Sequence, residues 1–237
     1  MVIGLKGVLM AKSSFTKKDV QDAWNEIRIN TGIVDSVMKK EHNMPEVGEF
    51  STNVALQETW AGKRYDKNAG HTMGPWQIDA IKMYDIQQNL NNSKTYRKRR
   101  QTINNYFKSK GYPANFDIAK IATVKKDGNK YSYSGFSQYK NDVLVNAFLA
   151  RLGLASVKES VPTDNAYKQA EYWKKHWNKS GRGVPTEFLE KLEKFGVYDN
   201  QKLTEDSVMY GPWVTRNAFT RHLFPDETPF PFRTDDE

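Results

Sequence analysis

The sequence contains no cysteine among its 237 residues. This absence excludes disulfide bonds, zinc sites built on thiolates and a cysteine nucleophile. The four histidines, at positions 42, 71, 176 and 222, are scattered and do not show the spacing of metal ligands. We therefore expect neither a structural metal ion nor a cofactor.

Long apolar runs are also missing. No stretch approaches the roughly 18–20 residues that a membrane-spanning helix needs. The first residues, MVIGLKGVLMAKSS, are mildly apolar, but Lys6 and two glycines interrupt them. This segment is too short for the apolar region of a signal peptide. We expect a protein with neither a membrane span nor a signal peptide.

Positive charge and aromatic rings are plentiful. The formal net charge is +8, which indicates a polyanionic partner, either nucleic acid or an anionic cell envelope. Hydrophobic residues make up 38% of the chain and aromatic residues 13%, enough for a sizeable core. Most of the aromatic rings are expected in that core, and a few are expected to line a groove for sugars or bases.

Helical periodicity dominates the pattern of apolar residues. A helix is expected from Thr16 to a break at Gly32, then a second short helix, then a helix through residues 53–60 that ends near Gly62. Further helices are expected at about 76–90, 94–110, 139–153, 164–178 and 185–195. The Asp127-Gly128 pair predicts a β-hairpin, the one good strand signal. The sequence therefore predicts a mainly α fold with a small β-hairpin.

Glu58 is the candidate catalytic acid. It ends a predicted helix, has Leu56 and Trp60 as close apolar neighbours, and precedes a glycine-rich loop. An apolar environment disfavours the charged form of a carboxyl group, so the pKa of Glu58 should be raised. A general acid for glycoside cleavage needs such a pKa because it must hold a proton near neutral pH.

Two motifs connect Glu58 to a known family. The segment Ala55-Leu56-Gln57-Glu58 is followed, nineteen positions after the Glu, by Gly74-Pro75-Trp76-Gln77. In this arrangement the chain resembles the soluble lytic transglycosylases and goose-type lysozymes. In that family a helix carries Ala-Leu and the catalytic Glu, and a loop leads to Gly-Leu-Met-Gln at the next helix.

The resemblance covers about residues 53–195. Trp177-Asn178 takes the place of Tyr-Asn in the family's late Ala-Tyr-Asn-Ala-Gly motif. The chain departs from the family in three places. Thr59 replaces the Ser that follows the Glu, Pro75-Trp76 replaces Leu-Met, and no Ala-Gly follows Asn178.

The resemblance implies a lysozyme-like catalytic domain over residues 51–200, between an N-terminal helical segment at 1–50 and a C-terminal extended arm at 201–237. It implies cleavage of the β-1,4 bond between N-acetylmuramic acid and N-acetylglucosamine in peptidoglycan, with Glu58 acting first as acid and then as base. The expected substrate-binding residues are Thr59, Gly74, Trp76, Gln77, Tyr84, Trp177 and Asn178.

Three alternatives remain open. A hydrolytic lysozyme would need a second carboxylate, for which Asp66 is the candidate, with Asp79 behind it. The chain could instead be a non-catalytic virion protein that keeps the fold as a scaffold and contacts other virion proteins. The basic helix at 94–110, which interleaves Tyr96, Tyr106 and Phe107 with its charges, would suit a nucleic-acid binder. We favour a wall enzyme that is virion-associated, or cytoplasmic until released, over a nucleic-acid binder.

Overall fold

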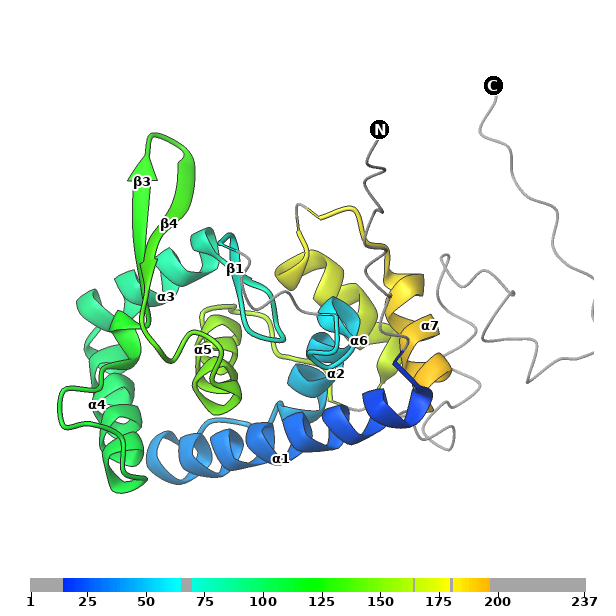
Figure 1. The fold of residues 1–237 in the computed structure, drawn as a ribbon, viewed down its shortest axis with the longest axis horizontal. Coiled ribbons are helices and arrows are strands. Elements are labelled where there is room, and N and C mark those ends of the chain that lie inside the picture. Colours follow the sequence, from blue (N-terminus) through cyan, green and yellow to red (C-terminus); the bar gives the residue numbers. More distant parts are fainter. Residues whose placement is uncertain (1–14, 65–69, 164, 180, 197–237) are drawn as a thin grey trace, which may run out of the picture.

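The computed structural model describes residues 15–64, 70–163, 165–179 and 181–196. Within these ranges the chain is mainly helical and carries two small antiparallel hairpins (Figure 1). The prediction of a mainly α fold with a small β-hairpin is confirmed. None of the helices in the described ranges has the length and apolar character needed to span a membrane.

Helix α1 (Lys17–His42) is a single long helix. Thr16 caps it, because its hydroxyl oxygen accepts from Asp19 N at 3.1 Å. The predicted break at Gly32 is wrong. Gly32 lies on the exposed side of the helix, while the buried face that includes Trp24 continues through Val34. Packing of that face outweighs the roughly 0.5–1 kcal/mol that a glycine costs inside a helix.

Helix α2 (Gly48–Thr59) is buried along most of its length. Its first turn is held by Asp35 of α1, whose Oδ2 accepts from Val47 N at 2.8 Å and from Gly48 N at 2.6 Å. The buried Arg151 pairs with the other oxygen of Asp35 at 3.4 Å. The helix ends at Trp60, whose φ of 53° is left-handed, two residues before the predicted end.

The chain from residue 72 to residue 79 forms a tight hairpin of β1 (Thr72–Met73) and β2 (Ile78–Asp79). This hairpin was not predicted, and it delays the next helix, α3 (Ala80–Asn92), relative to the expected start near residue 76. Asp79 caps α3 by accepting from Lys82 N at 2.8 Å. The prediction failed here because a two-residue strand is too short to produce an alternating pattern.

The later elements follow the expected order. They are α4 (Lys94–Ser109), β3 (Ala122–Asp127), β4 (Lys130–Phe136), α5 (Val143–Ala155), α6 (Ala166–Tyr172), a π-helical turn (Trp173–Trp177) and α7 (Pro185–Phe195). The hairpin predicted at Asp127-Gly128 is confirmed, since Asp127 pairs with Lys130. It projects from the helical body (Figure 1).

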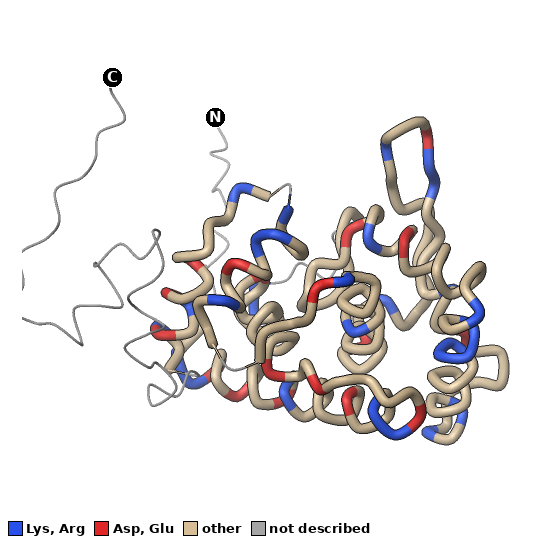
Figure 2. The backbone as a smooth tube through the Cα atoms, turned by 180° about the vertical axis from the view of Figure 1, so that it is seen from behind, with Lys and Arg blue, Asp and Glu red and all other residues tan. Residues whose placement is uncertain are grey.

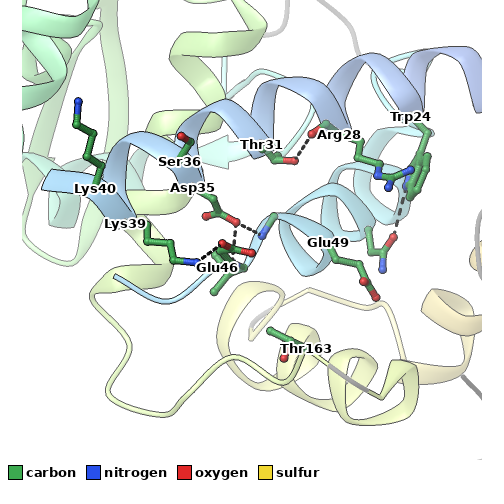
Figure 3. Close-up of a pocket in the computed structure, with 14 residues that line it drawn as sticks. Trp24, Arg28, Thr31, Asp35, Ser36, Lys39, Lys40, Glu46, Glu49 and Thr163 are labelled. Atoms are coloured by element: carbon green, nitrogen blue, oxygen red, sulfur yellow. Dashed lines mark hydrogen bonds and ion pairs between the residues drawn. The ribbon is translucent and has the colours of Figure 1, made fainter. Parts of the chain in front are cut away.

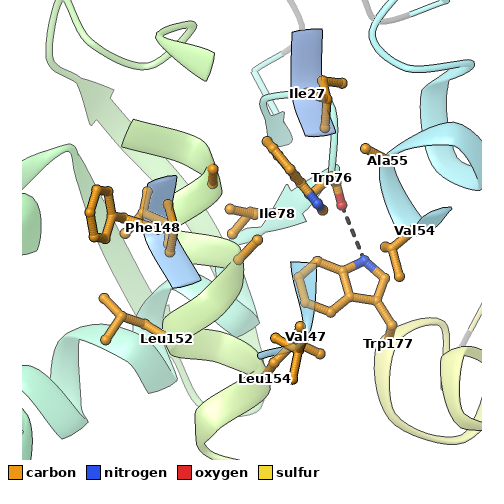
Figure 4. Close-up of a cluster of buried hydrophobic side chains, with 14 of the residues drawn as sticks. Ile27, Val47, Val54, Ala55, Trp76, Ile78, Phe148, Leu152, Leu154 and Trp177 are labelled. Atoms are coloured by element: carbon orange, nitrogen blue, oxygen red, sulfur yellow. Dashed lines mark hydrogen bonds between the residues drawn. The ribbon is translucent and has the colours of Figure 1, made fainter. Parts of the chain in front are cut away.

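One hydrophobic core joins the helices. Helix α1 runs along α2, α5 and α7, and the buried side chains of all four belong to a single cluster. Figure 4 shows part of this cluster, where Trp76 and Trp177 lie between α2 and α5. The described residues therefore do not separate into segments 1–50 and 51–200, because α2 starts at Gly48. The arm expected at 201–237 lies outside the described residues.

Candidate active site

Glu58 lies in the last turn of α2, where its side chain is half-buried. Burial is the largest influence on its carboxyl group and raises its pKa above the ordinary value. A hydrogen bond from Trp173, together with the charges of Lys82 and Lys191, acts in the opposite direction, and Asp79 adds a smaller upward effect. The net shift is upward, as the sequence predicted.

The partner of the Glu58 carboxylate is an indole. Trp173 Nε1 donates to Glu58 Oε1 at 2.8 Å, and the Trp173 side chain is almost fully buried, with its ring 5.7 Å from that of Phe188. Trp173 opens the π-helical turn, in which Asn178 N donates to Trp173 O at 2.8 Å. Such turns are frequent at functional sites.

Sequence reasoning missed Trp173 and placed Trp177-Asn178 at this position instead. The two tryptophans are four residues apart, so they share one helix face. That spacing was the available signal, because it places both indoles toward the same side of the site.

A tight turn at residues 74–77 packs against the end of α2. Gly74 adopts a φ of +63°, and the hydroxyl of Thr59 lies 2.7 Å from the carbonyl oxygen of Pro75. The amide of Gln77 then donates to the main-chain oxygen of Glu58 at 2.9 Å. Gln77 thus has one of its two expected roles, holding the loop beside Glu58.

Three expected substrate contacts do not fit this structure. Trp76 is fully buried and its indole donates to Ser51 O at 2.8 Å. Trp177 is 5% exposed and donates to Trp76 O at 3.1 Å (Figure 4). The prediction that one of these rings stacks on a sugar is wrong, because neither presents a face to solvent. Thr59 is also fully buried, so its hydroxyl positions the loop and does not meet a substrate. Gly74 is buried and serves the turn in the same way.

The remaining expected residues lie apart from the Glu58 carboxyl or outside the described ranges. The ring of Tyr84 packs 5.1 Å from that of Tyr131 in the β3–β4 hairpin. Asn178 folds over its own loop, where a Cβ added to Gly181 would meet Asn178 Oδ1 at 1.5 Å. Asp66 lies outside the described residues.

A buried lysine that was not predicted completes the site. Lys191 of α7 donates to Gln57 O at 2.5 Å. Burial lowers its pKa, while the nearby Glu58 and Glu187 carboxylates raise it. Lys191, Lys82 and the indole of Trp173 all favour the ionised form of Glu58, while burial favours the neutral form. A carboxyl group under such opposing influences is suited to give up a proton and later take one back.

A cavity of about 930 Å³ lies elsewhere, along α1 and the first turn of α2 (Figure 3). Its lining includes Trp24, Arg28 and Glu49 but not Glu58. Because α2 has twelve residues, its two ends are separated by roughly 16–18 Å. In the described ranges no group of three or more histidines and carboxylates could hold a metal ion.

Comparison with known proteins returned no match: neither a protein-family model, nor a curated protein, nor a solved structure is significantly similar to this chain. The functional argument therefore depends on the geometry around Glu58.

Proposed function

We propose that this chain is a peptidoglycan lytic transglycosylase that cleaves the β-1,4 bond between N-acetylmuramic acid and N-acetylglucosamine, with Glu58 as general acid and base. One observation carries the proposal: a half-buried carboxyl group at the end of a rigid helix has a raised pKa and a fixed indole donor. The contact of Gln77 with the Glu58 main chain, at the spacing expected from the motifs, supports it.

The indole determines which oxygen of Glu58 carries the proton. An indole N–H can only donate, so Oε1 must accept from Trp173, and the proton of the neutral acid resides on Oε2. In the first step Oε2 gives this proton to the glycosidic oxygen as the bond to the muramoyl C1 breaks. The resulting carboxylate is stabilised by Trp173, Lys82 and Lys191.

In the second step the carboxylate acts as base. It removes the proton from the C6 hydroxyl of the same muramoyl residue, whose oxygen then bonds to C1. The product is a 1,6-anhydro sugar, the new glycan end is N-acetylglucosamine, and no water is consumed. Glu58 returns to its neutral form, ready for the next bond.

The second candidate is a hydrolytic lysozyme. Asp79 is favoured here by one observation, since it lies close enough to Glu58 to raise its pKa. A retaining or inverting hydrolase places its second carboxyl group roughly 5–9.5 Å from the first. However, the carboxylate of Asp79 already caps α3. Asp66 is kept as the other candidate for this role.

The test is digestion of purified peptidoglycan sacculi, followed by mass spectrometry of the released fragments. We expect anhydro-muramoyl products from the wild type, and a loss on the order of 10²–10⁴-fold in Glu58→Gln, which cannot deliver a proton. Glu190→Gln, an exposed site on α7, is the matched control and should retain full activity.

The products separate the alternatives. Reducing-end fragments, with an equally deep loss in Asp66→Asn or Asp79→Asn, would move the assignment to a hydrolase. Intact sacculi after prolonged exposure to the folded wild type would leave a non-catalytic virion protein as the better description.

A further inference from the structure

Helix α4 carries a stripe of positive charge with no acidic residue anywhere along the helix. The stripe consists of Lys94, Arg97, Lys98 and Lys108, all of them exposed, with the exposed amides of Gln101 and Asn105 between them. Figure 2 shows lysines and arginines gathered along this helix. We call these six residues the α4 stripe.

The stripe is straight and lies opposite the buried face of the helix. Its members are separated by steps of one, three or four residues, so they share one side of an α-helix, while Ile103 and Phe107 on the other side are fully buried. From Lys94 to Lys108 the stripe is about 21 Å long, at 1.5 Å per residue. It is therefore a rigid, linear array of hydrogen-bond donors on the surface.

The cations of the stripe are not used within the fold. Among the described residues, no ion pair joins any of the four to a carboxylate, and Arg97 makes one bond, to the carbonyl oxygen of Asn91 at 3.3 Å. The other two cations of α4 are committed. Arg100 is bonded to Asp117, and Arg99 lies over the ring of Tyr96 at 4.6 Å.

The aromatic residues of α4 are turned away from the stripe. Phe107 is fully buried and packs 5.3 Å from Phe148. Tyr106 contacts Phe148 at 5.6 Å, and the hydroxyl of Tyr96 is buried. Binding of single-stranded nucleic acid relies on rings that bases can stack on, and this helix presents none beside its charges.

We infer that the α4 stripe binds linear phosphodiester polymers that lack bases and are attached to the bacterial wall. The inference rests on the proposed function, because it is the wall that brings such polymers to the protein. A straight array of cations and amides matches the repeated phosphates of a flexible chain, and each contact releases condensed counterions. Binding there would keep the enzyme at the wall between cleavage events.

The experiment measures sedimentation of the protein with purified walls, before and after hydrofluoric acid extraction of their phosphodiester polymers, over a range of salt concentrations. The test variant is Lys94→Gln/Arg97→Gln/Lys98→Gln/Lys108→Gln. The control variant, Lys120→Gln/Lys158→Gln/Lys168→Gln/Lys179→Gln, removes the same charge from exposed positions on other elements. Glu58→Gln is introduced in every protein, so that binding is measured without digestion.

We expect tight binding to unextracted walls, with a slope of log affinity against log salt that falls by about 3 in the test variant, at roughly 0.7 per phosphate contact. Extraction of the walls should abolish this difference, and the control variant should keep nearly the original slope. Wall binding in a protein whose wild type proves unable to cleave glycan would refute the proposed function and leave this inference standing.

Two results would overturn it: equal binding to extracted and unextracted walls, which would indicate peptidoglycan carboxylates, or equal slopes in the test and control variants. Oligo(dT) or duplex DNA bound more tightly than unextracted walls at the same salt would assign the stripe to nucleic acid instead.

Discussion

Gly74 offers the sharpest test of the turn beside Glu58. Its φ is +63°, and a Cβ built on it would lie 2.4 Å from both Cγ and Oδ1 of Asn146. Gly74→Ala should therefore carry two costs. A left-handed backbone with a Cβ costs about 1–2 kcal/mol, and overpacking of a buried contact adds about 1–3 kcal/mol. We expect the free energy of unfolding to fall by about 2–5 kcal/mol.

Gly111→Ala is the matched control. Gly111 also has a positive φ, of +88°, but no atom lies within 4 Å of its added Cβ. Only the backbone cost of about 1–2 kcal/mol should apply there. Urea denaturation with linear extrapolation measures both variants. Asn146→Ala in the Gly74→Ala background removes the two closest atoms and should recover part of the loss.

Equal destabilisation by Gly74→Ala and Gly111→Ala would refute the close packing of the turn against α5. It would also undermine the position of Gln77, because the same turn delivers its amide to the main chain of Glu58. If the packing is as described, Gly74→Ala should reduce wall digestion more than Gly111→Ala does when the two are compared at equal folded fraction.

Two further predictions concern the carboxyl group itself. Trp173→Phe keeps an aromatic ring but removes the donor that lowers the pKa of Glu58, so that pKa should rise further, the alkaline limb of the pH–rate profile should move to higher pH, and kcat should fall; an unchanged limb, or an unchanged Glu58 resonance in a carboxyl NMR titration, would contradict this. The second uses stability. Because the folded-state pKa of Glu58 is raised, the wild type loses stability as pH rises from the ordinary carboxyl pKa through the raised one. Glu58→Gln should therefore be more resistant to thermal unfolding than the wild type near neutral pH, with the difference closing as pH falls below about 4.3, the ordinary pKa of Glu; a gap that widens on acidification would show that the pKa is lowered instead.

Local patterns in the sequence were sufficient for some parts of this fold. The capping box at Thr16 and the turn at Asp127-Gly128 are short-range signals that depend on a few adjacent residues. They predicted the start of α1 and the hairpin correctly. Gly32 misled the same reasoning because a glycine is judged by its helix propensity, whereas its surroundings here are decided by packing of the opposite face of α1.

The site was only partly accessible to sequence reasoning. The spacing between Glu58 and Gln77 carried information, and their contact is present. Trp173 lies 115 residues from Glu58, and no periodicity reports a pairing over that distance. Burial was the other obstacle. Trp76 and Trp177 were expected to be exposed rings, but their indole N–H groups find main-chain acceptors inside the core, as buried tryptophans usually do.

The hydrogen bond between Lys191 and Gln57 spans 134 residues of chain, and this separation has a consequence for the timing of synthesis. At roughly 5–20 residues per second, translation needs about 7–27 s to proceed from α2 to Lys191. During that interval Glu58 has neither its indole donor nor the cover of α7, so it remains an ordinary carboxylate with an ordinary affinity for protons. The acid we propose comes into being only when the last helix docks.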